Sequence, residues 1–200
     1  MKIRAVFLDV GGVVLKIDWT RPLEVLGVPH AQRGAIVEKL KAWPVFHRFE
    51  EGTAEPGEFF SGINQLLGLS ASREKLEEAW LSLIVGDLPG NELLFKWLEE
   101  NQVPVFALSN TNVVHDRFQV KHFPILGRFE HFYKSYQMGL RKPGVEIYLK
   151  ASELAGFNPE DCLFIDDTLE NVEGAVQAKW SAFHTVDDVG ATLKIFQQKI

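Results

Sequence analysis

IRAVFLD, at residues 3–9, is a short apolar run that ends at the carboxylate of Asp9. Two later stretches have the same form: VPVFALSN at residues 103–110 and CLFIDD at residues 162–167. None of the three alternates apolar with polar side chains, as a strand with one solvated face would. Continuous apolar runs of this length are typical of strands in a parallel sheet that is covered on both faces. The sequence therefore predicts a buried parallel sheet built around these strands.

Helical patterns alternate with the strands. Residues 90–101 place Leu93, Leu94, Trp97 and Leu98 on one face of a helix. Helices are also expected at residues 111–122, 143–156, 168–178 and 187–198, and weaker strands at residues 132–137 and 180–186. The alternation of strand and helix indicates a right-handed α/β fold with a Rossmann-like parallel sheet.

Residues 16–88 interrupt this alternation. They contain no convincing strand, and their patterns predict helices at residues 22–27, 31–43, 56–67 and 72–84. A crossover between two parallel strands needs far fewer residues than this. We therefore expect an α/β core formed by residues 1–15 and 89–200, and an inserted, all-helical lid formed by residues 16–88.

The composition narrows the class of protein. The 200 residues are 46% hydrophobic and 24% charged, which fits a folded, soluble chain and not a disordered one. The net charge of −6 argues against a nucleic-acid-binding protein, which would need a basic face. The single cysteine, Cys162, excludes an intramolecular disulfide and is expected to be a buried core thiol. There is no secretion signal and no apolar run near the ~18 residues of a membrane span, so we expect no membrane association and a location in the reducing cytoplasm.

Polar side chains follow the predicted strands. Ligands of open parallel α/β sheets bind outside the carboxyl ends of the strands, so these side chains should converge there. Carboxylates on one edge repel one another unless a cation lies among them, and hard oxygen ligands favour Mg²⁺. A remaining carboxylate oxygen can then attack phosphorus while a lysine and a serine hold the phosphoryl oxygens. The side chains in question are those of Asp9, Ser109, Asn110, Lys142, Asp166 and Asp167.

Four motifs resemble those of the haloacid dehalogenase-like (HAD) superfamily. FLDVGGVV at residues 7–14 resembles its first motif, in which a strand ends in a nucleophilic aspartate. LSN at residues 108–110 resembles the second, GLRKPGVEIY at 139–148 the third, and LFIDDTLENVEGA at 163–175 the acidic fourth motif. HRFEEGTAEPGEFFSGI at residues 47–63 resembles the helical segment of the family's C1-type cap. The resemblance spans nearly the whole chain and implies a HAD-like core with a C1-type cap.

The resemblance also implies a role for each matching residue. Asp9 would be the nucleophile that forms an aspartyl-phosphate, and it would bind Mg²⁺ together with the backbone carbonyl of Gly11. Asp166 would bind the metal directly, and Asp167 either directly or through water. The residues expected to hold the phosphoryl group of a small phosphorylated metabolite are Gly12, Ser109, Asn110 and Lys142.

Gly11 departs from the pattern of the family's phosphatases, which usually carry a second aspartate at this place to protonate the leaving oxygen. General acid–base catalysis contributes about 10²–10⁴-fold, so its absence is a serious deficit. A branch that resembles this chain carries Asp-x-Gly and includes sugar phosphatases of the glucose-1-phosphate type. We therefore expect a phosphatase for small monoesters with good leaving groups, with a sugar phosphate as one candidate substrate. The candidate proton or substrate contacts from the cap are His47, Arg48 and Glu50.

The sequence also allows three other functions. A catalytically weak or inactive HAD domain would bind a phosphorylated ligand or a protein, although the intact acidic cluster argues against it. A dehalogenase would lack the aspartate pair of the fourth motif, so Asp166 and Asp167 argue against dehalogenation. A phosphonate hydrolase would need a reactive cap lysine, whereas Lys39, Lys41 and Lys75 lie in charge-rich helical patterns typical of a solvated face. The sequence does not decide between a monomer and a homodimer.

Overall fold

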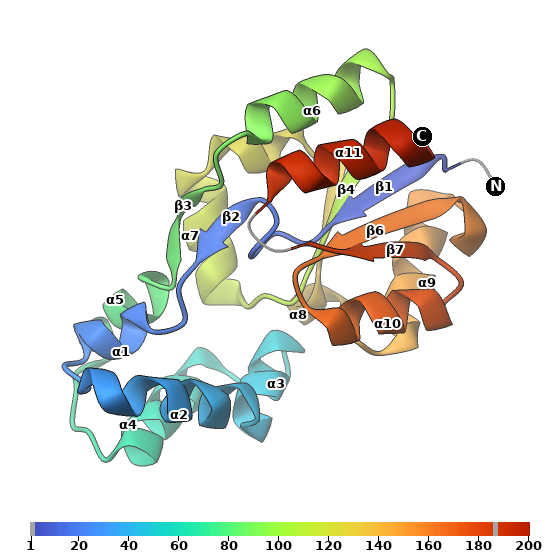
Figure 1. The fold of residues 1–200 in the computed structure, drawn as a ribbon. Helices are drawn as coiled ribbons and strands as arrows, with labels where there is room; N and C mark the ends of the chain where they lie inside the picture. Colours follow the sequence, from blue (N-terminus) through green and yellow to red (C-terminus); the bar gives the residue numbers. More distant parts are fainter. Residues whose placement is uncertain (1–2, 186–187) are drawn as a thin grey trace.

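The fold is built on a five-stranded sheet in which every neighbouring pair of strands is parallel. The computed structural model describes residues 3–185 and 188–200. The strand order is β5-β4-β1-β6-β7, with β1 at the centre (Figure 1). The strands are β1 (Ala5–Leu8), β4 (Val105–Ser109), β5 (His131–Lys134), β6 (Cys162–Asp166) and β7 (Ser181–His184). The predicted α/β class and the parallel sheet are confirmed.

Helices cover both faces of this sheet (Figure 1). On one face Leu8 packs in a cluster that includes Phe95 and Phe196, and on the other face Phe7 packs with Tyr148. Because both faces are buried, the strands carry no polar alternation, as their sequence indicated. The first face is covered by α6 (Asn91–Glu100), α7 (Val113–His122), η1 (Pro124–Arg128) and α11 (Val189–Lys199), and the second by α9 (Val145–Ala155) and α10 (Leu169–Gln177).

Several predicted elements begin or end at other residues than expected. The strand expected at 132–137 ends at Lys134, and α8 (Ser135–Met138) follows, with η2 (Pro159–Asp161) before β6. The α11 helix begins at Val189, where the side chain of Asp188 accepts a hydrogen bond from the backbone N–H of Ala191 at 2.9 Å. Asp187, with which the sequence prediction began this helix, lies outside the described residues.

The prediction that residues 16–88 contain no strand is wrong. Two strands, β2 (Leu15–Ile17) and β3 (Ile84–Asp87), pair antiparallel as a separate ribbon. Each strand is too short to give a local sequence signal, and the ribbon is stabilised by partners far apart in the chain. The ribbon forms both connections between the sheet and the segment inserted after β1.

The inserted segment forms a helical block, α1 to α5, between the two ribbon strands. The block lies beyond the ends to which the strand arrows point (Figure 1). Its aromatic core includes Phe49 and Phe59, whose rings stack with centroids 4.3 Å apart. Among the described residues, no helix is both long and apolar enough to cross a membrane. The helices are α1 (Arg21–Val25), α2 (His30–Lys41), α3 (Pro44–Glu50), α4 (Pro56–Leu67) and α5 (Arg73–Leu81); α3 was not predicted as a separate helix.

Candidate functional site

The strand register brings the predicted site residues to one edge of the sheet. Leu8 of β1 is in register with Ala107 of β4 and with Ile165 of β6. The next residues along β1 and β6 are Asp9 and Asp166, which therefore lie side by side at the carboxyl ends. The backbone N–H of Asp9 also donates a 2.8 Å hydrogen bond to the carbonyl of Ile165.

Lys142 is buried between these two carboxylates. Its Nζ lies 2.8 Å from Asp9 Oδ1 and 2.6 Å from Asp166 Oδ2, and the side chain is only 1% exposed. Burial works to lower the pKa of Lys142, but Asp166 and Asp9 outweigh it and hold this pKa above its ordinary range. The ammonium therefore stays charged at the base of the site, where it can neutralise an anion.

Asn110 fixes the backbone that carries Lys142. The Asn110 side-chain amide donates to the carbonyl of Lys142 at 2.9 Å, and the backbone N–H of Lys142 donates back to Asn110 Oδ1 at 2.8 Å. The side chain of Asn110 is therefore a positioning group for Lys142. Among the described residues, the neighbouring Ser109 hydroxyl has one contact, at 3.5 Å with the Asn110 carbonyl, and it lines the cavity described below.

Three carboxylates form an acidic cluster. Asp9, Asp166 and Asp167 each offer an oxygen within 4.8 Å of the others. With the one ammonium of Lys142 among them, three negative charges and one positive charge leave an excess of two. Burial and the neighbouring carboxylates raise the pKa of Asp9 above its ordinary range, with Lys142 acting against them. An oxygen-rich site short of two positive charges suits a hard divalent cation such as Mg²⁺.

The hydrogen bonds of Asp166 bear on which carboxylates are free to bind a cation. Its Oδ1 accepts from the backbone N–H of Thr168 at 2.8 Å and from Asn171 Nδ2 at 3.0 Å. Its Oδ2 accepts from Lys142 and, at 3.1 Å, from Asn171. The Asp167 side chain, by contrast, lines the cavity, and among the described residues it accepts a hydrogen bond only from the Thr168 hydroxyl, at 3.3 Å. Both oxygens of Asp166 are therefore already hydrogen-bonded, whereas the Asp167 carboxylate has acceptor capacity left for a cation.

The loop after Asp9 is held by its own backbone. Gly12 has a φ of 76°, and its N–H donates to the carbonyl of Leu15 at 2.8 Å. The side chain of Asp167 occupies the space that a Cβ on Gly12 would need. Gly12 thus allows the close approach of Asp167, and its N–H is already used, which does not fit the expected contact with phosphate. Gly11 lines the cavity itself.

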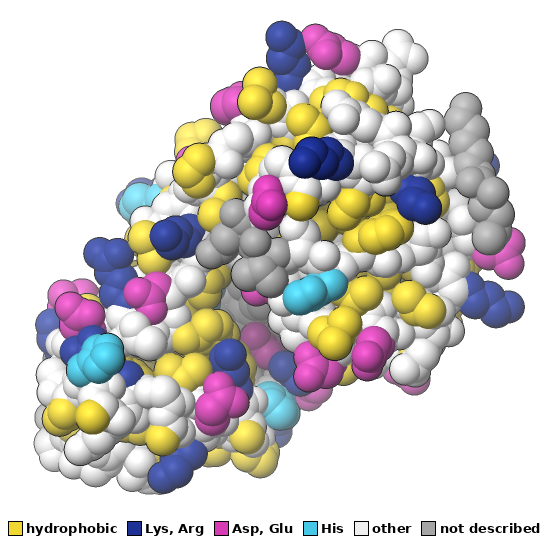
Figure 2. Space-filling view, in the orientation of Figure 1, with side chains coloured by type: hydrophobic (Ala, Val, Ile, Leu, Met, Phe, Trp, Pro, Cys, Tyr) yellow, Lys and Arg dark blue, Asp and Glu magenta, His cyan; other side chains and the backbone are white. Residues whose placement is uncertain are grey.

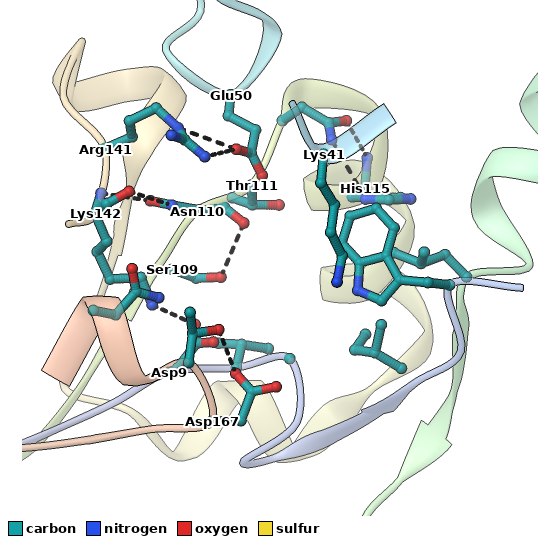
Figure 3. A pocket seen from close by; sticks show the side chains of 18 of the residues that line it. Asp9, Lys41, Glu50, Ser109, Asn110, Thr111, His115, Arg141, Lys142 and Asp167 are labelled. Atoms are coloured by element: carbon teal, nitrogen blue, oxygen red, sulfur yellow. Dashed lines mark hydrogen bonds and ion pairs between the residues drawn. The ribbon is translucent and has the colours of Figure 1, made fainter. Parts of the chain in front are cut away.

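A cavity of about 700 Å³ lies between this edge of the sheet and the helical block. Figure 2 shows the hollow from outside, and Figure 3 shows Asp9, Ser109, Lys142 and Asp167 at one end of it. Arg48 is not among the lining residues, because its guanidinium pairs with Glu58 on the exposed side of the block. The predicted residues that line the cavity are Asp9, Gly11, His47, Glu50, Ser109, Asn110, Lys142 and Asp167, whereas Gly12 and Asp166 do not line it.

Glu50 of α3 connects the helical block to the sheet. Its Oε2 accepts hydrogen bonds from Arg141 Nε at 3.2 Å and Nη2 at 2.8 Å (Figure 3). Its backbone carbonyl accepts from the Ser135 hydroxyl at 2.6 Å. Burial raises the pKa of Glu50, and Arg141 partly offsets this. The ion pair closes one wall of the cavity next to Lys142.

Lys41 and His115 are among the lining residues that were not predicted as site residues. Lys41 is exposed, as expected for a solvated face, and it also borders the cavity, with its Nζ 5.1 Å from the centre of the Trp19 ring. His115 of α7 lines the same side of the cavity, stacked on the ring of Trp80, and its Nε2 is 2.9 Å from the carbonyl of Trp80. No local spacing marks these residues, because the fold brings them together from separate segments.

His115 gives a testable pH dependence. Burial lowers its pKa to about 4, against about 6.5 in an unfolded chain. The unfolded state therefore binds the proton first, and His115 makes stability fall as the pH drops from about 6.5 towards about 4. Between about pH 7.5 and about pH 5.5, the free energy of unfolding should fall by about 1 kcal/mol less in the His115→Gln variant than in the wild type, as measured by urea unfolding.

The same measurement on His122→Gln, at an exposed position of the same helix, is the matched control. An unchanged slope in His115→Gln would show that His115 is not held neutral in the folded protein.

The sequence model of haloacid dehalogenase-like hydrolases matches residues 3–179. The chain belongs to the haloacid dehalogenase-like hydrolase family. The match includes the whole helical block and four of the five strands of the sheet, and it ends just before β7. The resemblance seen in the four sequence motifs is thereby confirmed.

Curated relatives of this HAD enzyme include phosphatases with different substrates. A D-ribitol-5-phosphate phosphatase from Bacteroides thetaiotaomicron is 27% identical over 184 residues, which cover 85% of each chain. A sesquiterpene phosphatase from Aspergillus oryzae is 24% identical over 196 residues, covering 97% of this chain and 95% of the relative.

Solved structures give the same family. A HAD family enzyme from Bacteroides thetaiotaomicron, in complex with magnesium and inorganic phosphate, has a TM-score of 0.81 at 30% identity and covers 95% of this chain and 98% of its own. An L-2-haloacid dehalogenase superimposes with a TM-score of 0.75 at 18% identity, over 98% of this chain and 100% of its own. That second likeness concerns the fold alone.

Proposed function

We propose that this HAD enzyme is a Mg²⁺-dependent phosphatase that hydrolyses a small phosphate monoester through an aspartyl-phosphate on Asp9. The observation that carries the proposal is the arrangement at the base of the cavity, where Asp9 lies between the buried ammonium of Lys142 and the carboxylate of Asp167. A phosphoryl group there meets a nucleophile, a fixed cation and a metal-binding pair of carboxylates. The named phosphatases among the relatives support this activity.

The acidic cluster fits the metal. In our proposal Asp9 and Asp167 bind Mg²⁺ directly, with the carbonyl of Gly11 as a further oxygen, while Asp166 orients Lys142. When bound, Mg²⁺ supplies charge neutralisation to the phosphoryl oxygens and to the carboxylates around them. The related HAD enzyme that was crystallised with magnesium and inorganic phosphate supports this assignment.

The proposed reaction has two steps. A carboxylate oxygen of Asp9 attacks phosphorus, the bond from phosphorus to the ester oxygen breaks, and the alcohol leaves as its anion, which takes a proton from solvent. Water then attacks phosphorus, the bond between phosphorus and the Asp9 oxygen breaks, and one proton of the water passes to solvent, which leaves inorganic phosphate and the Asp9 carboxylate. Throughout, the Lys142 ammonium, the Ser109 hydroxyl and the backbone N–H of Asn110 hold the phosphoryl oxygens and stabilise their charge.

Gly11 leaves the departing alcohol without a carboxylic acid at the usual place. His47 lines the cavity, but its Nε2 is engaged with the backbone carbonyl of Lys41 at 2.6 Å. The reaction should therefore favour alcohols that are stable as anions. A sugar phosphate is one candidate substrate. The relatives act on a ribitol phosphate and in a sesquiterpene phosphatase reaction, so the family alone does not identify the alcohol that is released.

We also propose that residues 16–88 act as a cap over the core formed by residues 1–15 and 89–200. The β2–β3 ribbon connects the two parts, and the ion pair of Glu50 with Arg141 holds the block against the sheet edge. Because the cavity wall comes from both parts, opening the cap would admit the substrate and closing it would exclude water.

Assays of phosphate release test the proposed function. A panel of aryl, anomeric and polyol phosphates is incubated with Mg²⁺ and, in parallel, with excess EDTA. We expect slow release that depends on Mg²⁺ and is fastest for aryl and anomeric esters. Inactivity towards the whole panel, while Mg²⁺ and inorganic phosphate still bind, would contradict the phosphatase and favour a phospho-ligand binding module.

Restoring the missing acid should increase turnover of poor leaving groups. A Cβ on Gly11 would lie 3.0 Å from Ile17 Cγ1, so the substitution needs room. We therefore expect the double variant Gly11→Asp with Ile17→Ala, which removes Cγ1, to raise kcat for an alkyl phosphate by about tenfold or more, with little change for an aryl phosphate. Ile17→Ala alone is the matched control. Equal effects on both substrates would contradict a missing general acid.

A further inference from the structure

The far end of the cavity has an apolar wall. Away from Asp9, the lining changes to the aromatic rings of Trp19, Phe46 and Trp80 together with Leu83 and Ile84. The rings meet edge to face, with centroids 5.9 Å apart for Trp19 and Phe46 and 6.3 Å apart for Trp19 and Trp80. This wall offers van der Waals contact to a flat apolar group and few partners to a hydroxyl.

Most polar side chains on this wall are already used. Asn112 Oδ1 accepts hydrogen bonds from the backbone N–H groups of Val114 and His115, which cap α7. His115 is engaged with the carbonyl of Trp80, and the ring of His47 with the carbonyl of Lys41. A polyol buried here could pair with Trp80 Nε1 and Gln119 Nε2 and would leave its other hydroxyls without partners, which disfavours binding.

Lys41 is the cation among the lining donors that are not used in this way, which also include the neutral Trp80 Nε1 and Gln119 Nε2. Its ammonium lies over the Trp19 ring and, within the residues that the structure describes, forms no ion pair. Figure 3 shows its side chain reaching into the cavity on the side opposite Lys142. A second anion of the ligand could therefore meet this charge while the phosphate stays with Lys142.

We propose that the alcohol of the substrate is a flat, aromatic or enolic ring that packs against Trp19, Phe46 and Trp80 and carries a carboxylate towards Lys41. This inference rests on the proposed function and names its substrate class. Gly11 agrees independently, because a phenol or enol can leave as an anion without a general acid. Trp19 and Lys41 are thus the specificity-determining residues of the cap.

Binding of non-hydrolysable phosphonates tests this proposal separately from the activity. In calorimetric titrations of the full chain with Mg²⁺, naphthylmethylphosphonate should bind about tenfold or more tightly than 3,4-dihydroxybutylphosphonate. 4-(Phosphonomethyl)benzoate should in turn bind about threefold to tenfold more tightly than benzylphosphonate, and added salt should reduce this second preference. These affinities do not depend on turnover or on the leaving group.

A matched pair of lysine variants tests the contact with Lys41. Lys41→Met should abolish the preference for the benzoate and leave the affinity for benzylphosphonate nearly unchanged. Lys39→Met, two residues earlier on the same helix and exposed, should keep the preference. Folding of both variants is checked by their urea unfolding midpoints.

The outcomes separate this proposal from the proposed function. Tighter binding of the dihydroxybutyl compound, or a benzoate preference that survives in Lys41→Met, would overturn the substrate class even if phosphate esters are hydrolysed. The expected affinities without any phosphate release in the substrate panel would support the ring site and contradict the phosphatase instead.

Discussion

Replacing Asp9 with asparagine should abolish phosphate release, with a loss of kcat of about 10⁴-fold or more for every substrate. The amide keeps the shape of the side chain beside Lys142 but is a much weaker nucleophile than the carboxylate. Initial rates on an aryl phosphate at saturating Mg²⁺ measure the loss. Because the loss is in the chemical step, it should be as large for a good leaving group as for a poor one.

The control for this variant is Asp87→Asn, which removes an exposed carboxylate from β3 outside the cavity lining. It should retain wild-type activity. Appreciable turnover by Asp9→Asn, with folding intact, would show that Asp9 is not the nucleophile.

Replacing Lys142 with methionine should have the largest effect on stability. The ammonium is 1% exposed and lies within 3 Å of both Asp9 and Asp166, so its removal leaves two buried carboxylates without their cation. Breaking a buried ion pair in this way costs about 3–5 kcal/mol, which urea unfolding near pH 7 measures. Activity should be lost as well, because the phosphoryl oxygens lose their fixed positive charge.

The matched control is Lys150→Met, at an exposed lysine paired with Glu153, where a change of at most about 1 kcal/mol is expected. The deficit of Lys142→Met should also shrink on acidification, because protonating Asp9 relieves the uncompensated charge. A fully stable Lys142→Met variant would contradict the charge balance described for the site.

Local sequence patterns identified the parallel strands and the residues at their ends. A continuous apolar run such as the one that begins at Cys162 is buried on both faces only inside a covered sheet. The polar residue that ends each run marks the edge of the sheet. Asp9, Ser109 and Asp167 could therefore be assigned to one site from order alone, since parallel strands end on the same side. The structure brings all three to the cavity.

Other parts of the site depend on contacts between distant segments. The β2–β3 ribbon pairs two short strands across the whole helical block, so neither has a local signal. Arg48 has the residue type of a phosphate contact, but it pairs with Glu58 of α4, and neither residue lines the cavity. Lys41 has the pattern of a solvated lysine and becomes a cavity residue only because Trp19 lies beside it.

Trapping the covalent intermediate shows directly whether Asp9 is the nucleophile. Wild-type protein is mixed with an aryl phosphate carrying radioactive phosphorus in the presence of Mg²⁺, quenched in acid within the first turnover, digested and mapped by mass spectrometry. We predict label on the peptide that contains Asp9, absent with EDTA and absent in Asp9→Asn. Label on a different residue, or steady phosphate release without any labelled protein, would contradict an aspartyl-phosphate on Asp9.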